Sequence, residues 1–214
     1  MRDPPRPEAH VATTTKLDLF KKHKAEYVAP RKPVLVTIGP AKYLAVEGKG
    51  EPSGVSFQGA IGALYAVAFT IKMTRKLAGK VEYKVAWLEG LWWGPNKAAP
   101  FSVKSPKDWR WKLLIRTPTF VSVRDLARAQ QALLAKGKAP EFRKVKLEAI
   151  REGKCVQMLH VGPYEREAAT LEAMHDFAHA AGLEFRGVHH EIYLSDPRRV
   201  PPGRLRTILR HSVR

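Results

Sequence analysis

The chain has 214 residues, of which 44 % are hydrophobic, a length and share typical of a globular protein with a sizeable core. It carries 38 Lys and Arg against 20 Asp and Glu, a formal net charge of +18. The single cysteine, Cys155, excludes an internal disulfide framework and a cysteine-rich zinc site, and no apolar run reaches the roughly 20 residues that span a membrane. Because the basic residues lie in separate clusters (KKHK at 21–24, RKVK at 143–146 and the C-terminal arginines), we expect a solvated basic surface with at most non-specific affinity for nucleic acid.

The first half of the chain predicts an ordered series of elements. Residues 1–15 are Pro-rich and polar, which predicts a disordered tail, and 16–27 predict a short helix. Residues 33–48 predict strand, turn and strand, and 55–77 the longest helix. An apolar stripe at three- and four-residue spacing supports this helix: Phe57, Ile61, Leu64, Ala68 and Ile71. Strands are predicted over 81–93 and 108–118.

The second half repeats this order after a helical connector. The connector helix is predicted over 122–137, and two strand segments over 145–164 break at Gly153. A helix over 167–182 and the strands of GVHHEIYLSDP and GRLRTILRHSV follow. We therefore predict an α+β fold of two pseudo-symmetric strand–helix–strand–strand modules, whose antiparallel sheets surround a central ligand cleft. One domain, 16–214, would comprise module 1 (about 33–118), the connector (about 119–140) and module 2 (about 141–214).

A row of polar side chains marks the strand within residues 187–199. Alternation places His189, Glu191, Tyr193 and Ser195 on one face and Val188, His190, Ile192 and Leu194 on the other. In the matching strand of module 1, one face carries Trp87, Glu89, Leu91 and Trp93. We interpret Glu89 and Glu191 as corresponding acids of the two repeats, both facing the cleft among aromatic side chains.

Several motifs resemble those of one family. They are EGKG, FQGAIGALYAVAFTIKM, LEGLWW, DWRWKLLIRTP, CVQMLHVGPYEREAAT and HHEIYLSDPRR. Together they resemble the GyrI-like small-molecule-binding proteins, in particular the stand-alone two-module branch, over residues 16–212. The resemblance implies a central pocket of acidic and aromatic residues, which related transcription regulators use to bind hydrophobic cationic drugs.

The resemblance also implies an activity. Some stand-alone relatives hydrolyse the cyclopropane of DNA-alkylating natural products of the spirocyclopropyl-cyclohexadienone type, and so protect the cell. Antibiotic resistance and detoxification in the cytoplasm are the corresponding expectations; the reducing cytoplasm also fits the single cysteine and the absence of a signal-peptide pattern in MRDPPRPEAH.

Hydrolysis of such a ring would need a base, a donor to the developing phenolate and aromatic walls. Glu191 is the first choice of general base and Glu89 the second. Tyr193, His189 and His160 are candidate hydrogen-bond donors to the oxyanion. A planar ligand would stack on four aromatic side chains: Trp87, Trp93, Tyr65 and Tyr164.

Alternatives to these assignments stay open. Glu191 could instead pair with Arg198 or Arg199, and His190 could be a core histidine. Adjacent residues of a strand point to opposite faces, so His189 and His190 do not predict a metal site. No cofactor is predicted. Besides hydrolysis, two functions are compatible with the sequence: a non-catalytic module that sequesters drugs or senses an effector, and a basic protein associated with nucleic acid.

Overall fold

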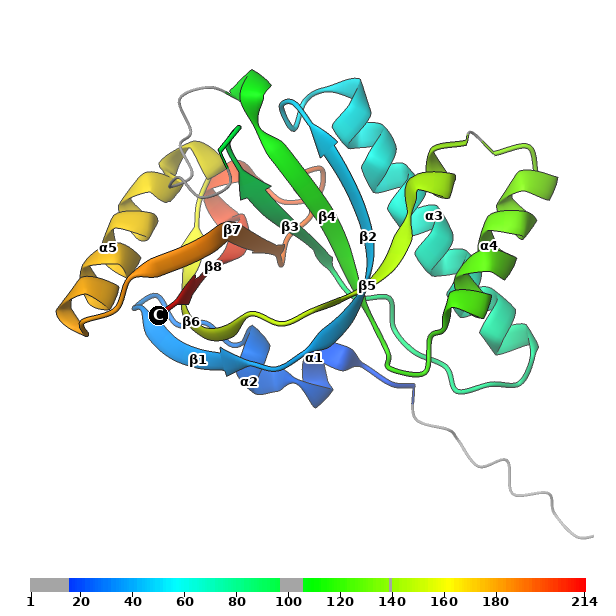
Figure 1. The fold of residues 1–214 in the computed structure, drawn as a ribbon, viewed down its shortest axis with the longest axis horizontal. Coiled ribbons are helices and arrows are strands. Elements are labelled where there is room, and N and C mark those ends of the chain that lie inside the picture. The colour runs from blue at the N-terminus through cyan, green and yellow to red at the C-terminus, as the bar shows by residue number, and fades with distance from the viewer. Residues whose placement is uncertain (1–15, 97–105, 139) are drawn as a thin grey trace, which may run out of the picture.

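The computed structural model describes residues 16–96, 106–138 and 140–214. The fold is α+β, as predicted (Figure 1). The predicted disordered tail, residues 1–15, lies outside the described residues. The helices are α1 (Leu19–Lys22), α2 (Lys24–Tyr27), α3 (Val55–Leu77), α4 (Val123–Ala135) and α5 (Glu167–Ala180), with short 3-10 turns at η1 (Pro106–Asp108), η2 (Pro140–Lys144), η3 (Tyr164–Arg166) and η4 (Pro202–Arg204). The strands are β1 (Val34–Ile38), β2 (Ala41–Lys49), β3 (Leu88–Trp93), β4 (Arg110–Thr117), β5 (Lys146–Ile150), β6 (Gly153–Val161), β7 (Phe185–Tyr193) and β8 (Arg206–Val213).

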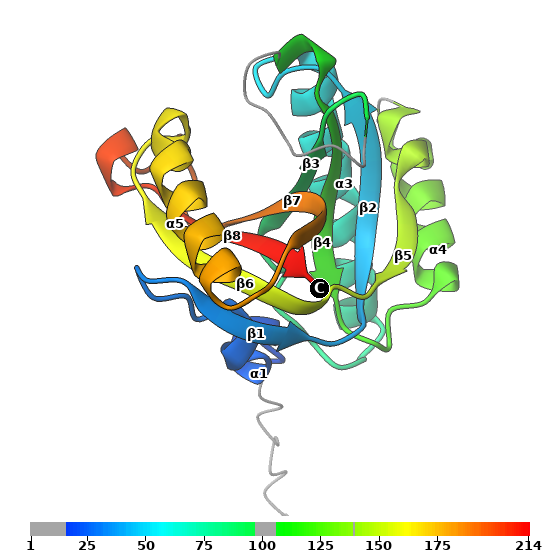
Figure 2. The ribbon, with the colours of Figure 1, turned by 60° about the vertical axis from the view of Figure 1, so that its left-hand side comes forward.

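The strands form one eight-stranded antiparallel sheet in the order β1-β6-β8-β7-β3-β4-β2-β5. Outward from the central pair, β7, β8, β6 and β1 on one side correspond to β3, β4, β2 and β5 on the other. The predicted pseudo-symmetry is therefore present. The sheet bends between its halves, with α5 beside β6 and β8 on one arm and α3 beside β4 and β2 on the other (Figure 2). The strands β3 and β7 join the two halves.

The two modules exchange their first strands, which the sequence did not predict. β1 pairs with β6 of the second module, and β5 pairs with β2 of the first. A hairpin between β1 and β2 was expected because neighbouring strands usually pair. Pro40 in the two-residue link lacks an N–H and keeps Gly39 extended, so the chain runs on to a different partner instead of turning back. The exchange ties each module to the other.

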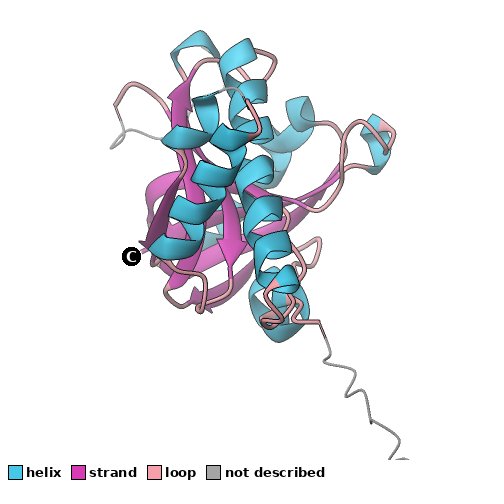
Figure 3. Ribbon diagram, turned by 90° about the vertical axis from the view of Figure 1, so that its right-hand side faces the viewer, coloured by secondary structure: helices cyan, strands magenta, loops and turns pink. Residues whose placement is uncertain are grey.

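Both α3 and α5 cover the same face of the sheet, called here the helix face. Leu64 and Ile71 of α3 pack on Trp111 and Leu113 of β4, in a core that also includes α4. Figure 3 shows α3 and α4 side by side in front of the strands. Met174 and Ala178 of α5 pack on Val156 and Leu209. Among the described helices, α3 alone has the length and hydropathy of a membrane span, a test that core helices also pass.

The opposite face is covered in part by α1 and α2. Tyr27 of α2 packs there against Ile192 and Ile208. The helix predicted over 16–27 is in fact two short helices that meet at His23, and Asp18 caps the first by accepting from the Phe20 N–H at 2.9 Å. The strand predicted over 81–93 begins only at Leu88, because the chain before it forms an isolated parallel bridge between Leu17 and Tyr83.

Candidate functional site

The polar row of β7 lies on the helix face at the centre of the sheet. The pairing of Gly90 with Glu191, and of Trp92 with His189, places these residues on the face that carries Trp111 and Leu113. The alternation predicted for β7 is therefore confirmed. Glu191 is 9 % exposed and His189 is 1 % exposed, so the row is largely closed from solvent.

Glu191 is held by neighbours of the same strand. His189 Nε2 lies 3.1 Å from Glu191 Oε1. The Tyr193 hydroxyl also hydrogen-bonds to Glu191, and burial followed by the charge of Glu191 raises the pKa of Tyr193 well above its usual range. The phenol is therefore neutral and donates to the carboxylate. The alternative partner Arg198 instead pairs with Asp196 at 2.9 Å.

A glycine opposite Glu191 makes room for the tyrosine. A Cβ at Gly90 would lie 2.8 Å from the Tyr193 hydroxyl and 2.9 Å from Trp92 Nε1. Trp92 Nε1 donates to that hydroxyl at 3.1 Å, so the hydroxyl hydrogen can point to Glu191. Gly90, Trp92 and Tyr193 therefore act together to orient the donor of Glu191.

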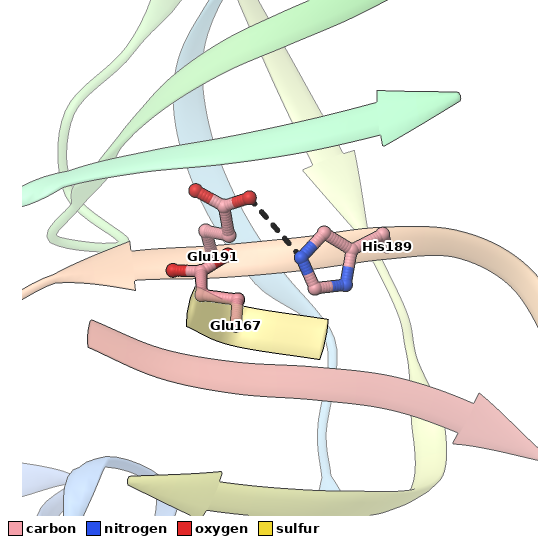
Figure 4. Close-up of side chains that lie close together, drawn as sticks. All are labelled: Glu167, His189 and Glu191. Carbon is pink, nitrogen blue, oxygen red and sulfur yellow. Dashed lines mark hydrogen bonds and ion pairs between the residues drawn. The ribbon is translucent and has the colours of Figure 1, made fainter. Parts of the chain in front are cut away.

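Glu167, at the start of α5, is a member of the site that the sequence reasoning missed. Figure 4 shows its carboxyl group beside Glu191 and His189. One ligand atom from each of the three side chains lies within 4.8 Å of the others, and Glu167 is 7 % exposed. Burial, then the charges of Glu191 and Glu165, raise the pKa of Glu167 to about 10, so this carboxyl holds a proton at neutral pH. In the sequence, an acid in a first helical turn is typical of helix capping and gave no separate signal.

Aromatic side chains flank this group on the helix face. Tyr164 contacts Tyr193 edge to face, with ring centroids 6.1 Å apart, and burial followed by Glu191 raises its pKa to about 12. Phe57 of α3 stacks on Trp92 at 5.4 Å. Tyr65 of α3 shares a hydrogen bond with the backbone of Leu88, which places it beside the start of β3. Tyr65 and Tyr164 therefore lie on the same face as Glu191.

Three predicted site residues lie on the opposite face of the sheet. Glu89, Trp87 and Trp93 belong to the opposite face: Glu89 bonds Tyr27, Trp87 contacts Phe20 of α1, and Trp93 packs on a small cluster with Leu91 and Leu114. The prediction that Glu89 and Glu191 face one cleft is wrong, because the register sets Gly90 and not Glu89 opposite Glu191.

His160 is on the helix face but beneath α5. Its Nδ1 lies 2.9 Å from Thr170 Oγ1 and its Nε2 lies 3.2 Å from the Pro163 carbonyl. Both ring nitrogens are therefore occupied in fixing the loop before α5 to β6. His160 positions the segment that carries Glu167, and it is not directed at Glu191.

Glu89 belongs to a charged network that joins the two halves. It is 0 % exposed, accepts from the Tyr27 hydroxyl at 3.1 Å and lies 3.0 Å from His190 Nε2. His190 also contacts Glu152, which in turn binds Arg210 at 2.8 Å. Although burial alone would lower it, Glu152 and Glu89 raise the pKa of His190 to about 9, so the ring is an imidazolium at neutral pH. The interpretation of His190 as a hydrogen-bonded core histidine fits these contacts.

Two surface hollows lie away from the site. One, of about 380 Å³, is lined by Lys16, Leu17, Asp18, Lys21 and Lys84. The other, of about 290 Å³, lies between α4 and η2. Neither is lined by Glu191.

The chain is similar to proteins of known structure. The profile described as GyrI-like small molecule binding domain matches residues 127–211. An uncharacterized conserved protein from Listeria innocua is 40 % identical, with a TM-score of 0.87 over 93 % of this chain and 100 % of its own. A hydrolase from Listeria innocua is 38 % identical, with a TM-score of 0.85 and the same coverage. The EcmrR C-terminal domain shares the fold at 10 % identity, with a TM-score of 0.54 over 86 % of this chain and 97 % of its own. No curated protein sequence matches.

Proposed function

Because the chain belongs to the GyrI-like family of small-molecule-binding domains, we propose that it binds planar hydrophobic or cationic molecules at Glu191 and hydrolyses those that carry a strained cyclopropane. The observation that carries this proposal is the closeness of the two buried carboxyl groups of Glu191 and Glu167, flanked by Tyr193 and Tyr164. The similarity to a Listeria hydrolase supports a hydrolytic reaction. Detoxification of a DNA alkylator in the cytoplasm would be the corresponding role.

The site supplies both groups that ring opening needs. The Glu191 carboxylate accepts a proton from water as the water oxygen bonds to a cyclopropane carbon. The carbon–carbon bond of the ring breaks, and its electron pair makes the cyclohexadienone aromatic, leaving a phenolate. A proton from Glu167 or a hydrogen bond from Tyr193 stabilises that oxygen, and the proton gained by Glu191 returns the pair to its first state. The product is the substrate plus one water.

The aromatic side chains of the helix face would bind the planar part of the substrate. Tyr164 belongs to η3 and Tyr65 to α3, and both lie on the helix face. Rings of this kind contact a flat ligand by stacking, each with about 0.5–1.5 kcal/mol beyond the area buried. Trp87 and Trp93 are not part of this proposed surface, because they lie on the opposite face.

Mass spectrometry of a spirocyclopropyl-cyclohexadienone alkylator incubated with the protein tests the proposal. We expect a product heavier by one water. Glu191→Gln should reduce its rate by about 10²–10⁴-fold, the usual contribution of a general base. The matched control is Glu172→Gln, which removes an exposed acid of α5 and should leave turnover nearly unchanged.

Tight binding of the alkylator with no water adduct would reject hydrolysis and favour the sequestering module. Turnover that persists in Glu191→Gln but is lost in Glu89→Gln, with both variants folded, would reject the site. Salt-sensitive DNA binding unaffected by either substitution, without binding of the alkylator, would favour the nucleic-acid function instead.

A further inference from the structure

The group formed by Glu167, His189 and Glu191 has the donor set of a metal site. We infer that these three side chains bind one divalent transition-metal ion of the Zn²⁺ type. Each offers one ligand atom, and these atoms all lie within 4.8 Å of one another. The ion would use two side chains of the hydrolysis proposed above, but its binding needs no organic ligand and is therefore tested separately.

The spacing suits an ion with short bonds. Ligand atoms bonded to one Zn²⁺ at about 2.0–2.2 Å stand roughly 3–4 Å apart. His189 Nε2 and Glu191 Oε1 are 3.1 Å apart, within that range. Glu167 would need to move by at most about 1 Å to complete the set, because the largest separation is no more than 4.8 Å. The three side chains come from β7 and the start of α5, two elements fixed by the core (Figure 4).

A second observation is a buried oxygen of Glu167 without a hydrogen-bond partner in the part of the chain that the structure describes. Oε1 of Glu167 is buried and has no hydrogen-bond partner among the described residues, although the residue is only 7 % exposed. A buried polar atom without a partner costs about 1–3 kcal/mol. A cation between the carboxyl groups would satisfy that atom and would take the place of the proton that Glu167 otherwise holds.

The histidine is supported as metal-binding histidines usually are. His189 Nδ1 lies 3.0 Å from His211 Nε2, so the nitrogen that faces away from the acids has a hydrogen-bond partner. Such a partner fixes the ring and leaves the other nitrogen to bind the ion. Phe185 stacks on His211 at 4.5 Å with an interplanar angle of 4°, which holds this partner in place.

The ligand types favour a particular class of ion. Two carboxylates alone would suit Mg²⁺ or Ca²⁺, whereas an imidazole favours zinc, iron, nickel or copper. Three protein ligands leave at least one position open, as in catalytic zinc sites. We therefore expect Zn²⁺ to bind and Mg²⁺ not to compete with it.

Calorimetric titration of the EDTA-treated, desalted protein with ZnCl₂ tests this site. One Zn²⁺ per chain should bind, and Glu167→Gln and Glu191→Gln should each weaken binding by more than tenfold. His211→Gln should weaken it by about 10–100-fold, as the loss of a supporting partner does. The matched control is His179→Gln, an exposed histidine of the same helix as Glu167, which should leave the affinity unchanged. Circular dichroism checks that each variant is folded.

Cobalt gives a readout that folding alone does not change. Co²⁺ added in place of Zn²⁺ should produce visible absorption bands that disappear in Glu167→Gln and remain in His179→Gln. Absence of stoichiometric Zn²⁺ binding would overturn the inference. So would Zn²⁺ binding that is lost in His179→Gln and kept in both Glu167→Gln and Glu191→Gln, because the ion would then lie on the protein surface. Hydrolysis measured separately in EDTA reports on the proposed function and not on the ion.

Discussion

Replacement of Glu89 by Gln should destabilise the protein, whereas the same replacement at Glu191 should not. Glu89 is fully buried between the Tyr27 hydroxyl and the His190 ring, at 3.1 and 3.0 Å. His190 carries a positive charge at neutral pH, since Glu152 and Glu89 raise its pKa to about 9 against the effect of burial. Removing one partner of a buried ion pair costs about 3–5 kcal/mol. For a chain of this length that loss lowers the melting temperature by about 10 °C.

Glu191→Gln is the matched comparison. Its neighbours His189 and Tyr193 can still hydrogen-bond to an amide, and the carboxyl of Glu167 beside it is uncharged at neutral pH. We therefore expect a change within about 1 kcal/mol. Urea unfolding followed by tryptophan fluorescence measures both variants at pH 7. Equal stability of Glu89→Gln and the unmodified protein would refute this account of the network. A loss of small-molecule turnover in Glu89→Gln without a loss of stability would return Glu89 to the candidate catalytic residues.

Three further predictions follow from single residues. Although burial opposes it, His190 and Arg210 lower the pKa of Glu152 to about 2, from about 4.5 in the unfolded chain. The resulting stabilisation of about 3 kcal/mol is therefore present above pH 4.5 and is lost as the pH falls toward 2. The free energy of unfolding, measured in urea at stepped pH, should lose this pH dependence in Glu152→Gln. Gly90→Ala should weaken ligand binding and lower the free energy of unfolding by about 1–3 kcal/mol, because its Cβ meets Tyr193 and Trp92. A Cβ at Gly59 in α3 meets open space, so Gly59→Ala should raise the free energy of unfolding by about 0.5–1 kcal/mol. Equal effects of the two variants in thermal unfolding would contradict the close contact at Gly90. Burial, followed by Glu152, raises the pKa of Cys155 to about 11, so the thiol should react with a disulfide reagent only after unfolding, and fast labelling of the native protein would be evidence against its burial.

Local patterns predicted the elements well. The apolar stripe of residues 55–77 predicted the bounds of α3, because a helix buries one side at every turn. The alternation in β7 separated Glu191 from His190 correctly, because each strand has only two faces. These inferences need only residues that are close in the sequence, and they define the α+β fold.

Pairing between distant strands could not be predicted in the same way. Alternation groups Trp87, Glu89 and Trp93, but it does not say which face of β3 meets the helices. That choice depends on the register with β7, and a shift of one residue moves every side chain to the other face. The exchange of β1 and β5 is non-local for the same reason. Glu167 was missed because it lies on α5 and meets Glu191 only in the folded chain.

The two buried acids of the central strands differ in what balances their charge. Glu89 faces the imidazolium of His190, which is held in turn by Glu152 and Arg210, so its charge is matched by fixed groups of the chain. Among the described residues, no Lys or Arg forms an ion pair with Glu191; its neighbours are a histidine, a neutral tyrosine and a second acid. A carboxylate matched by fixed cations stabilises a fold, whereas one without them favours a cation from outside. This difference is the physical reason why we propose the helix face, and not the opposite face, as the place where a positive ligand binds, whether an organic cation or a metal ion.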